Sequence, residues 1–538
     1  MSGLSGENMY LLTAEEMRRM DEMTINDLGL PGRVLMENAG RGATRVILET
    51  FPDIYAGNVI VVAGRGNNGG DGFVIARYLA QAGVNVSVYL MAERQRVRGD
   101  ALANMELLSI LGIEVVELPD ENTFIRHKTN MGKNTLWVDA ILGTGLTDEI
   151  KGYFNAVINY INSHSSPVFS VDIPSGLSSE TGTPCPISIK ADATATFAFA
   201  KIGHMLMPGA FFTGSLHIID IGIPSYVVEH VAPRQHLSRL GDIRASMKPR
   251  SPQAHKGTTG HLLVIAGSHG KTGAAVMTAM SAMRCGAGLV TIGLPKAINA
   301  SVEPQVCEAM THSLEDKGSG ILTNAVLDEI LTLLTNKRCM AIGPGIGTHD
   351  KTRRLVENLV KESPVPIVMD ADALNCIVGN TQVLKERKSE VIITPHPGEM
   401  ARLIGSTTDD VQNDRVACAR KFAEMHGVYV VLKGARTVMA LPDGRLQINT
   451  TGNPGMASGG MGDVLTGIIA GFITQQYEIR AALRNAVYLH GAAADLLYQK
   501  RAYYGYLATD VMNMIPDTIK SIMDASFVNV SAPHSPIL

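Results

Sequence analysis

Short apolar runs alternate with longer stretches in which apolar residues recur at helical spacing, and this alternation continues along most of the chain. Residues 58–63 and 84–90 in the first half, and residues 261–266 in the second, read as strands. Near the N-terminus, Thr13 and Glu16 have the spacing of a capping box, which predicts a helix that begins there. Strands that alternate with helices are typical of an α/β fold with parallel sheets.

The length of the chain predicts more than one domain. Its 538 residues exceed what one ordinary core accommodates. After Pro224 the sequence becomes polar and irregular, and we place a boundary between about residues 226 and 240. The expected domains are therefore residues 1–235 and residues 236–538.

Composition and charge exclude several classes of protein. An apolar content of 45% with a charged content of 18% describes a compact enzyme, and a net charge of −4 argues against a general nucleic-acid binder. The six cysteines are scattered without a CxxC pair, which favours free thiols in a reducing compartment. The N-terminus lacks the apolar region of a signal peptide, and no apolar run is long enough to span a membrane. We expect a cytoplasmic protein without membrane or nucleic-acid partners.

The stretch Asn453–Gly467 carries the clearest chemical signal. Residues 455–462 contain four glycines, which let a backbone approach a bulky anion, and apolar residues at helical spacing follow. The N–H groups of the first helical turn, which includes Gly462 and Asp463, would then face the anion. A carboxylate in this place is suited to take the proton of a hydroxyl that attacks a phosphoryl group. The alternative is an ordinary aspartate that stabilises the start of a helix.

A second glycine-rich stretch, residues 64–72, joins the strand at residues 58–63 to a helix. Strand, glycine-rich turn and helix in this order form the phosphate-binding arrangement of doubly wound sheets. Asn67, Asn68 and Asp71 place polar side chains among the glycines, which indicates a pocket for an anion and a hydroxylated or cationic group. A flexible surface turn is the alternative.

Polar residues also follow two later strands of the first half. Asp139 closes one apolar run, and Asp172 closes another, with Ser175 shortly after it. Because the carboxyl ends of parallel strands line the ligand crevice, we expect Asp71, Asp139 and Asp172 to face one pocket. Each of these aspartates could instead cap a helix. Lys201, in a further short strand, could meet a phosphate or a substrate carbonyl, but a solvated surface lysine is the expected reading.

Apolar strands of the second half end in similar turns, which contain Gly343 and Gly345, Asp370 and Asp372, and His396 and Glu399. His396 lies between two prolines that fix its loop, although a single histidine on an apolar strand is more often a core residue. Lys433 follows an apolar strand, where a lysine can bridge nucleotide phosphates. Residues 267–275 fail as a Walker A loop, because Ile265 stands where the first glycine is required.

These motifs resemble those of two known families. Residues 460–463 resemble the GxGD anion-hole loop of ribokinase-like kinases, and Asn453–Gly467 is similar to the signature of ADP/ATP-dependent NAD(P)H-hydrate dehydratases. Met461 departs from the threonine or serine that is usual there. The strings GNNGGDG, VDAILGTGL and VDIPSGL make about residues 10–225 similar to the NAD(P)H-hydrate epimerase domain. The resemblance implies an N-terminal Rossmann-like three-layer αβα sheet and a C-terminal ribokinase-like αβα sheet.

The epimerase resemblance implies roles for residues of the first half. A potassium ion would be held by Asn68, Asp139 and Ser175, whose oxygen atoms suit a weakly hydrated monovalent cation better than zinc. The substrate would contact Asn67, Asn68, Gly69, Gly70, Asp71, Gly143, Thr144, Gly145, Leu146, Thr147, Asp148, Glu149 and Asp172. Asp172 is our candidate for the proton-transfer group.

The dehydratase resemblance, over about residues 240–520, implies a second set of roles. The hydrated nicotinamide would contact Ala274, Gly345, His396 and Asp463, although Ala275 could equally match the position of Ala274. The adenine nucleotide would be held by Lys433, Gly434, Ala435, Arg436, Thr437 and Gly462. Asp463 would be the catalytic residue.

Both resemblances imply one activity, the repair of NADHX and NADPHX, which are nicotinamide cofactors hydrated at C6. The first half would interconvert the R and S epimers, and the second would dehydrate the S epimer with ADP or ATP and Mg²⁺; resemblance to fused bacterial-type chains favours ADP. We also expect a homo-oligomer. Three alternatives remain open. The second half could be a kinase for a small vitamin precursor or sugar, the first half could be a non-catalytic nucleotide-binding module, and the whole chain could have a purely structural or interaction role, which would leave its glycine-rich strand ends unexplained.

Overall fold

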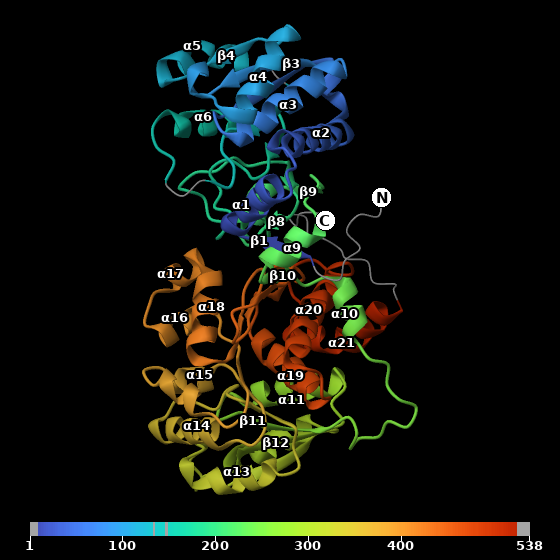
Figure 1. The fold of residues 1–538 in the computed structure, drawn as a ribbon. Coiled ribbons are helices and arrows are strands. Elements are labelled where there is room, and N and C mark those ends of the chain that lie inside the picture. Colours follow the sequence, from blue (N-terminus) through green and yellow to red (C-terminus); the bar gives the residue numbers. More distant parts are fainter. Residues whose placement is uncertain (1–8, 133–134, 146–148, 525–538) are drawn as a thin grey trace. The chain divides into compact units, whose positions relative to one another are not determined.

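The computed structural model describes residues 9–132, 135–145 and 149–524. The chain divides into two compact units, one formed by Tyr10–Gln235 and the other beginning at His236, so that the division falls within the short strand β10 (Gln235–Leu237). Each unit has its own sheet of mainly parallel strands (Figure 1), and each has its own buried core.

The first unit is built on a sheet of parallel strands in the order β4-β3-β2-β5-β6-β7-β9. These strands are β2 (Asn58–Ala63), β3 (Asn85–Leu90), β4 (Val115–Glu117), β5 (Leu136–Ala140), β6 (Val168–Val171), β7 (Ala193–Phe197) and β9 (Ser215–Ile219). A shorter parallel ladder in the same unit pairs β1 (Tyr10–Leu12) with β8 (Ala200–Lys201).

Helices cover both faces of this sheet. Along β2, Val59, Val61 and Ala63 pack with helices α2, α3 and α4, whereas Ile60 and Val62 pack with α5 and α6. Successive side chains of a strand point to opposite faces, so burial of both faces explains why β2 is apolar throughout. The helices are α1 (Ala14–Glu22), α2 (Gly32–Thr50), α3 (Asn67–Gln81), α4 (Gly99–Ile110), α5 (Glu121–Met131), α6 (Tyr153–Asn162), α7 (Ile202–Met205), α8 (Gly209–Thr213) and α9 (Ser225–Val231).

The strand order of the first unit reverses beside β2. From β2 the order continues through β3 to β4 on one side, and from β5 through β6 and β7 to β9 on the other. At such a reversal the loops that follow the two central strands diverge and leave a crevice. The crevice therefore lies after Ala63 and Ala140, the last residues of β2 and β5.

The second unit has a sheet in the order β13-β12-β11-β14-β15-β16-β17-β18-β19. The pairs from β13 to β17 are parallel, and β18 and β19 add antiparallel pairs. The strands are β11 (His261–Ile265), β12 (Leu289–Pro295), β13 (Met310–Leu314), β14 (Cys339–Ile342), β15 (Ile367–Met369), β16 (Val391–Ile393), β17 (Tyr429–Leu432), β18 (Val438–Ala440) and β19 (Leu446–Ile448).

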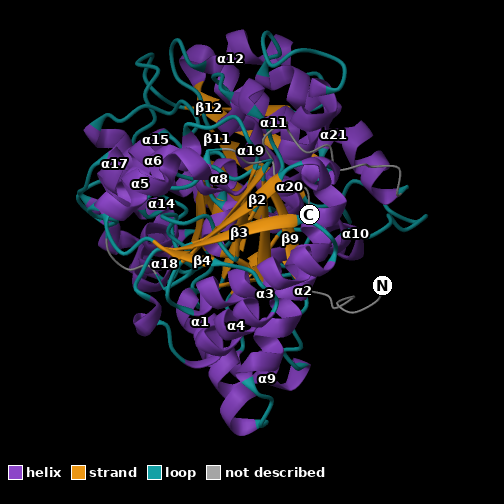
Figure 2. Cartoon of the chain, turned by 90° about the horizontal axis from the view of Figure 1, so that it is seen from above, coloured by secondary structure: helices purple, strands orange, loops and turns teal. Residues whose placement is uncertain are grey.

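Helices also pack against the strands of the second unit; Figure 2 shows the helices of the chain in purple and its strands in orange. Leu262 and Val264 of β11 join a core with helices α11, α19, α20 and α21, while the intervening Leu263, also fully buried, points to the opposite face. The helices are α10 (Leu240–Ser246), α11 (Thr272–Arg284), α12 (Lys296–Val302), α13 (Leu327–Leu334), α14 (Asp350–Glu362), α15 (Asp372–Cys376), α16 (Pro397–Ile404), α17 (Thr408–Asn413), α18 (Arg415–His426), α19 (Met461–Thr474), α20 (Ile479–Tyr498) and α21 (Ala508–Met523).

The strand order of the second unit reverses between β11 and β14. The loops that follow these two strands are joined by hydrogen bonds: the Gly267 N–H donates to the Pro344 carbonyl at 2.8 Å, and the Ser268 hydroxyl donates to the Gly345 carbonyl at 2.7 Å. Here too a crevice is expected at the carboxyl ends of the strands.

The predicted fold class is confirmed, since each unit is an α/β structure with helices on both faces of a mainly parallel sheet. The predicted capping box is also confirmed: the Glu16 N–H donates to the Thr13 hydroxyl at 3.1 Å, and the Thr13 N–H donates to the Glu16 carboxylate at 2.9 Å. Among the described residues, no helix has both the length and the apolar character needed to cross a membrane.

Close contact between α11 and α19 generates a prediction about stability. A Cβ atom on Gly467 would lie 2.1 Å from Ser281 Oγ and 2.2 Å from the Thr278 carbonyl oxygen. We expect Gly467→Ala to destabilise the second unit by about 1–3 kcal/mol, because overpacking forces the helices apart. The measurement is the urea concentration at which half of the protein is unfolded, monitored by circular dichroism.

The matched control is Gly273→Ala in α11, where an added Cβ would have no neighbour within 4 Å. This variant should keep the wild-type midpoint or raise it slightly, since alanine favours a helix. Trp137, the only tryptophan of the chain, lies in the core of the first unit, and its fluorescence reports separately on that unit. Equal midpoints for both variants would contradict the described packing.

Candidate functional site

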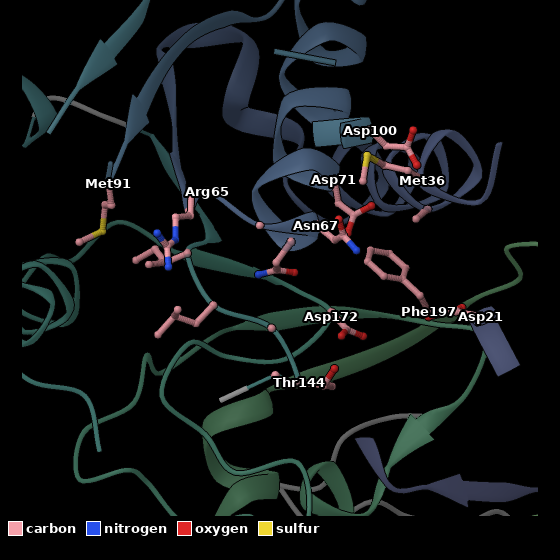
Figure 3. A pocket seen from close by; sticks show the side chains of 18 of the residues that line it. Asp21, Met36, Arg65, Asn67, Asp71, Met91, Asp100, Thr144, Asp172 and Phe197 are labelled. Atoms are coloured by element: carbon pink, nitrogen blue, oxygen red, sulfur yellow. The ribbon is translucent and has the colours of Figure 1, made fainter. Parts of the chain in front are cut away.

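A pocket of about 890 Å³ lies at the crevice of the first unit. Figure 3 shows side chains that enter it from several elements, among them Asp21, Asn67, Asp71 and Asp172. Of the predicted substrate contacts, the lining includes Asn67, Asn68, Asp71, Gly143, Thr144, Gly145, Glu149 and Asp172. Leu146, Thr147 and Asp148 lie outside the described residues.

The N-terminus of α3 forms one wall of this pocket. The helix begins earlier than the glycine-rich sequence suggests: Gly66 is its N-cap, so Asn67 and the residues after it are helical. The first N–H groups of the helix have no partner within the helix and are available to an anion.

Gly69 and Gly70, both predicted to contact substrate, are buried and are absent from the described pocket lining. A Cβ on Gly69 would lie 1.9 Å from the Gly64 carbonyl oxygen, and one on Gly70 would lie 2.7 Å from Met36 Sδ. These glycines let α3 approach the end of β2 and the helix α2 closely, so their role in the structure is packing.

The amide of Asn68 lies in the pocket wall and is available to bind a ligand. Both its Oδ1 and its Nδ2 atoms are buried, and neither has a hydrogen-bond partner in the described structure. A Cβ on Gly143 would lie 3.4 Å from Cγ of Asn68, so this amide lies against the turn that follows β5. Buried polar atoms are normally satisfied, which makes an unpaired amide in a pocket wall evidence for a missing partner.

Asp139 and Ser175 meet on the other side of the same turn. The fully buried Asp139 carboxylate accepts hydrogen bonds from the Ser175 N–H at 2.8 Å, from the Ser170 hydroxyl at 2.9 Å and from the Ser175 hydroxyl. The Leu142 N–H donates to the Ser175 hydroxyl at 2.9 Å. The turn thus connects the predicted ligands Asn68, Asp139 and Ser175.

This set of donors fits a cation such as potassium in its chemistry. It combines an amide, a carboxylate and a hydroxyl, and the Asn68 oxygen is free to accept a new partner. No group of three or more His, Cys, Asp or Glu side chains suited to a metal occurs in the described part of the chain. The potassium site stays a prediction.

Lys201 is not the solvated lysine that the sequence favoured. Its side chain is 1% exposed, and its Nζ lies 2.6 Å from Asp172 Oδ1. Nζ also donates to the Thr196 hydroxyl at 2.8 Å, and that hydroxyl donates to Asp172 at 3.1 Å. Although burial opposes its charge, the Lys201 ammonium holds the pKa of Asp172 below its usual value. Asp172 has a φ of 66°, an uncommon conformation that is often tied to function.

Two further carboxyl groups of the pocket have raised pKa values, in contrast to Asp172. Burial raises the pKa of Asp71 well above its ordinary range, and the charges of Asp172 and Asp21 add to the effect. Burial likewise raises the pKa of Asp21, in α1, to about 6. The pocket therefore contains an ionised Asp172 and carboxyl groups that resist ionisation.

In the second unit, α19 begins within the glycine-rich loop, as the sequence predicted. Gly460 is its N-cap with a φ of 88°, and Gly462 and Asp463 follow in the first turn. Met461 is 7% exposed and belongs to the hydrophobic core. The departure from the family signature at this position thus places a side chain in the core rather than in the site.

An ion pair between the partly buried Lys433 and the buried Asp370 lies next to this helix end. Lys433 Nζ is 2.6 Å from Asp370 Oδ1 and 3.7 Å from Glu399 Oε2, and the Thr466 hydroxyl donates to Asp370 Oδ2 at 2.8 Å. A Cβ on Gly462 would lie 3.2 Å from Lys433 Nζ, so the ammonium reaches the first turn of α19. Lys433 is therefore held by carboxylates rather than free to move.

Asp463 lies beside this pair and experiences the charges of Asp370 and Lys433 without contacting either directly. No hydrogen bond or ion pair of its carboxyl group is found among the described residues. Burial and the neighbouring charge of Asp370 raise the pKa of Asp463 to about 7, against the opposing effect of Lys433. A general base works best when its pKa is near the working pH.

His396 caps α16 rather than lying in the core. Its Nδ1 accepts hydrogen bonds from the N–H groups of Gly398 at 3.1 Å and Glu399 at 3.3 Å. Its Nε2 lies 3.4 Å from Glu399 Oε1, and half of the side chain is exposed. Glu399 thus connects His396 to Lys433.

Ala274 and Gly345 meet at the crevice of the second unit. A Cβ on Gly345 would lie 3.4 Å from the Cβ of Ala274, whereas Ala275 is fully buried in the core. Of the two alanines, Ala274 is therefore the one beside the predicted site. Lys271, from the same loop, lies 2.9 Å from Asp372.

Arg415 stabilises the predicted nucleotide loop, residues 433–437, by hydrogen bonds to its backbone. This arginine donates to the carbonyl oxygens of Ala435 at 2.6 Å and Leu432 at 3.1 Å. Within the loop, the Thr437 hydroxyl donates to the Gly434 carbonyl at 3.1 Å. Arg436 is 8% exposed and donates to the Thr450 carbonyl at 3.1 Å, so its side chain supports the loop.

Sequence reasoning missed several of these residues. Asp21 was overlooked, although it lies four residues after the buried Met17 and so on the apolar stripe of α1. For Asp370 and Glu399 the sequence indicates only a position at the end of a strand. The contact of Arg415 with the nucleotide loop could not be predicted, because a basic residue at the start of a helix is usually exposed.

Two family models match the chain. A model described as NAD(P)H-hydrate dehydratase matches residues 262–517, within the second unit. A model described as YjeF-related protein N-terminus matches residues 32–203, within the first.

Relatives match nearly the whole chain. The bifunctional NAD(P)H-hydrate repair enzyme Nnr of Moorella thermoacetica is 40% identical over 515 residues, which cover 96% of this chain and 97% of the relative. The enzyme of the same name from Escherichia coli is 35% identical over 508 residues, or 93% and 92% of the two chains. A solved ADP/ATP-dependent NAD(P)H-hydrate dehydratase from Bacillus subtilis, co-crystallised with ATP and Mg²⁺, is 32% identical and covers 53% of this chain and 98% of its own, with a TM-score of 0.47. The chain therefore belongs to the family of bifunctional NAD(P)H-hydrate repair enzymes.

Proposed function

We propose that this chain restores NADH and NADPH from their hydrated forms by two reactions, one in each unit. The first unit interconverts the R and S epimers at C6, and the second dehydrates the S epimer at the expense of ADP or ATP. The observation that carries the proposal is Asp463, an unpaired carboxylate with a pKa near 7 at a helix N-terminus, beside the buried Lys433–Asp370 pair. The relatives of this chain are repair enzymes of the same bifunctional type.

The dehydration begins with phosphoryl transfer. Asp463 removes the proton of the C6 hydroxyl as its oxygen attacks the terminal phosphoryl group of the nucleotide. The N–H groups at the start of α19 and the Lys433 ammonium stabilise the charge of the transferred group. The ring nitrogen then donates its electron pair as the C6–O bond breaks and phosphate leaves. Loss of a proton from C5 restores the dihydronicotinamide ring.

Each part of the second site has a distinct task in this reaction. Asp370 and Glu399 hold Lys433 in place, and Arg415 holds the loop at residues 433–437 against the nucleotide. Ala274, Gly345 and His396 form the surface for the nicotinamide. Magnesium would arrive with the nucleotide and neutralise part of its phosphate charge.

The epimerisation takes place in the pocket of the first unit. The α3 N-terminus and the turn after β5 bind the substrate, with Asp172 as a proton-transfer group. Asn68, Asp139 and Ser175 would hold potassium, whose charge would help to orient the diphosphate of the substrate. Support for this role comes from the unpaired Asn68 amide in the pocket wall.

We further propose a cytoplasmic location and a homo-oligomeric state, with small molecules as partners and no role for nucleic acid. The location is supported by the cysteines, which are all free in the structure, as expected in a reducing compartment. The net charge of −4 supports the absence of a nucleic-acid partner.

The whole chain should recover NADPH completely from a mixture of R and S hydrated NADPH supplied with nucleotide and magnesium. The measurement is the near-ultraviolet absorbance of the dihydronicotinamide. Recovery that stops when the S epimer is spent would contradict the epimerase role of the first unit. Accumulation of a stable phosphorylated product would instead indicate a small-molecule kinase.

Asp463→Asn should lower kcat for dehydration of the S epimer by about 10²–10⁴-fold, because an amide cannot accept the proton. In the wild type the base must be deprotonated, so kcat should rise with pH up to about 7 and level off above it. Asp443→Asn, a change of the same kind in the exposed turn before β19, is the control. A pH-independent wild-type kcat below pH 7 would argue against Asp463 as the base.

Exchange of potassium for a bulky organic cation should slow R-to-S conversion and leave S dehydration unchanged. In Asn68→Leu, which removes a ligand oxygen, the potassium response should weaken by about 10–100-fold. Chromatographic separation of the epimers, without nucleotide, measures conversion alone. Equal conversion rates with both cations would remove potassium from the mechanism.

A further inference from the structure

Four titratable groups from four separate elements converge on the pocket of the first unit. Asp21 comes from α1, Asp71 from α3, Asp172 from the turn after β6, and Lys201 from β8, and all four line the pocket. Figure 3 shows Asp71 and Asp172 entering the pocket from different elements.

The charges of this cluster do not balance. Lys201 supplies one buried ammonium, and its contact of 2.6 Å is with Asp172. Asp71 is 8% exposed, and within the described structure its carboxyl group has no hydrogen-bond or ion-pair partner. An unpaired buried carboxylate is costly, so Asp71 gains its proton instead. The raised pKa of Asp71 and the lowered pKa of Asp172 agree with this assignment.

We propose that Asp71 and Asp172 form an acid–base pair for epimerisation, with Asp71 as the proton donor, Asp172 as the proton acceptor and Lys201 as a positioning residue. This proposal rests on the epimerase function proposed above and names the groups that perform it. Two carboxyl groups whose surroundings drive their protonation in opposite directions are the arrangement that acid–base catalysis requires. Asp172, whose carboxylate contacts Lys201, has a φ of 66°, an uncommon conformation that is often found at functional sites.

The pair accounts for every proton and bond of the reaction. Asp172 takes the proton of the C6 hydroxyl as the C6–N1 bond breaks, and an aldehyde forms at C6. The electron pair of that bond moves to N1, which receives the proton of Asp71. Rotation about the C5–C6 bond exposes the other face of the aldehyde. When N1 attacks that face, N1 returns a proton to Asp71, and Asp172 returns one to the new hydroxyl.

Other charged groups also face the pair. Asp21, with a pKa of about 6, contributes negative charge near Asp71 as it ionises, and His204 of α7 lies beside Asp172 and Lys201. Burial lowers the pKa of His204 to about 3, so this histidine is neutral at working pH. Arg65, Arg96, Asp100 and Glu149 complete the charged lining of the pocket.

The test uses the full chain, pure R substrate and no nucleotide, so that only R-to-S conversion is measured. Asp71→Asn keeps the shape of the side chain but cannot transfer a proton, and kcat should fall by about 10²–10⁴-fold. In the wild type, kcat should rise with pH as Asp172 ionises and fall at higher pH as Asp71 ionises. Lys201→Met should move the acidic limb to higher pH, because Asp172 loses its neighbouring positive charge.

Two controls separate chemistry from folding. Asp120→Asn makes the same chemical change at the N-cap of α5, where asparagine also caps well, and should keep wild-type kcat and pH dependence. The fluorescence of Trp137, buried in the core of this unit, shows whether each variant has folded. Dehydration of the S epimer with nucleotide present should be unchanged in every variant.

Three outcomes would overturn the proposal. A folded Asp71→Asn variant with wild-type kcat would exclude Asp71 as the donor. A wild-type kcat that does not fall at high pH would also exclude Asp71 as the donor, even if the Asp71→Asn variant failed to fold. An acidic limb that stays in place in folded Lys201→Met would remove Lys201 from the mechanism. A wild-type chain that converts no R substrate would instead refute the epimerase function itself.

Discussion

One interaction recurs at the centre of both units: an ion pair at the ends of parallel strands, in which one partner is buried and the other is partly buried. Lys201 meets Asp172 in the first unit, Lys433 meets Asp370 in the second, and each pair is separated by 2.6 Å. Asp71 and Asp463 are further carboxyl groups near these pairs, and burial raises the pKa of both. The ionised aspartate of each pair adds to the rise, whereas the lysine opposes it. The electrostatics of each site thus combine burial with the charges of one ion pair.

The sheets explain how residues distant in the sequence form these pairs. In each unit the strand order reverses beside a central strand, and the loops after the carboxyl ends converge on the crevice. Lys433 lies 63 residues after Asp370 in the chain, yet both follow strands of one sheet. Glycines at 69 and 467 let α3 and α19 approach their neighbours closely.

Much of this arrangement could be predicted from the sequence, because periodicity and glycine-rich turns are local signals. The strand at residues 58–63 and the start of α19 before Asp463 agree with the structure. The burial of Lys201 could not be predicted, since its partner is 29 residues away and a lone lysine is usually exposed. For the same reason the sequence could not reveal that Gly69 serves packing, because that depends on how closely α3 approaches the Gly64 carbonyl.

The unpaired amide of Asn68 has a consequence for how this protein responds to selection. Both polar atoms of this amide are buried in the pocket wall and make no hydrogen bond within the described protein, so Asn68 contributes little to the stability of the fold. An apolar residue of similar size at this position would make the fold more stable and the pocket less able to recognise anything. Selection for heat resistance alone would therefore favour substitutions that replace residues of the site such as Asn68. In a library of this chain, stabilising substitutions that gather in one pocket would outline the active site without any assay of activity.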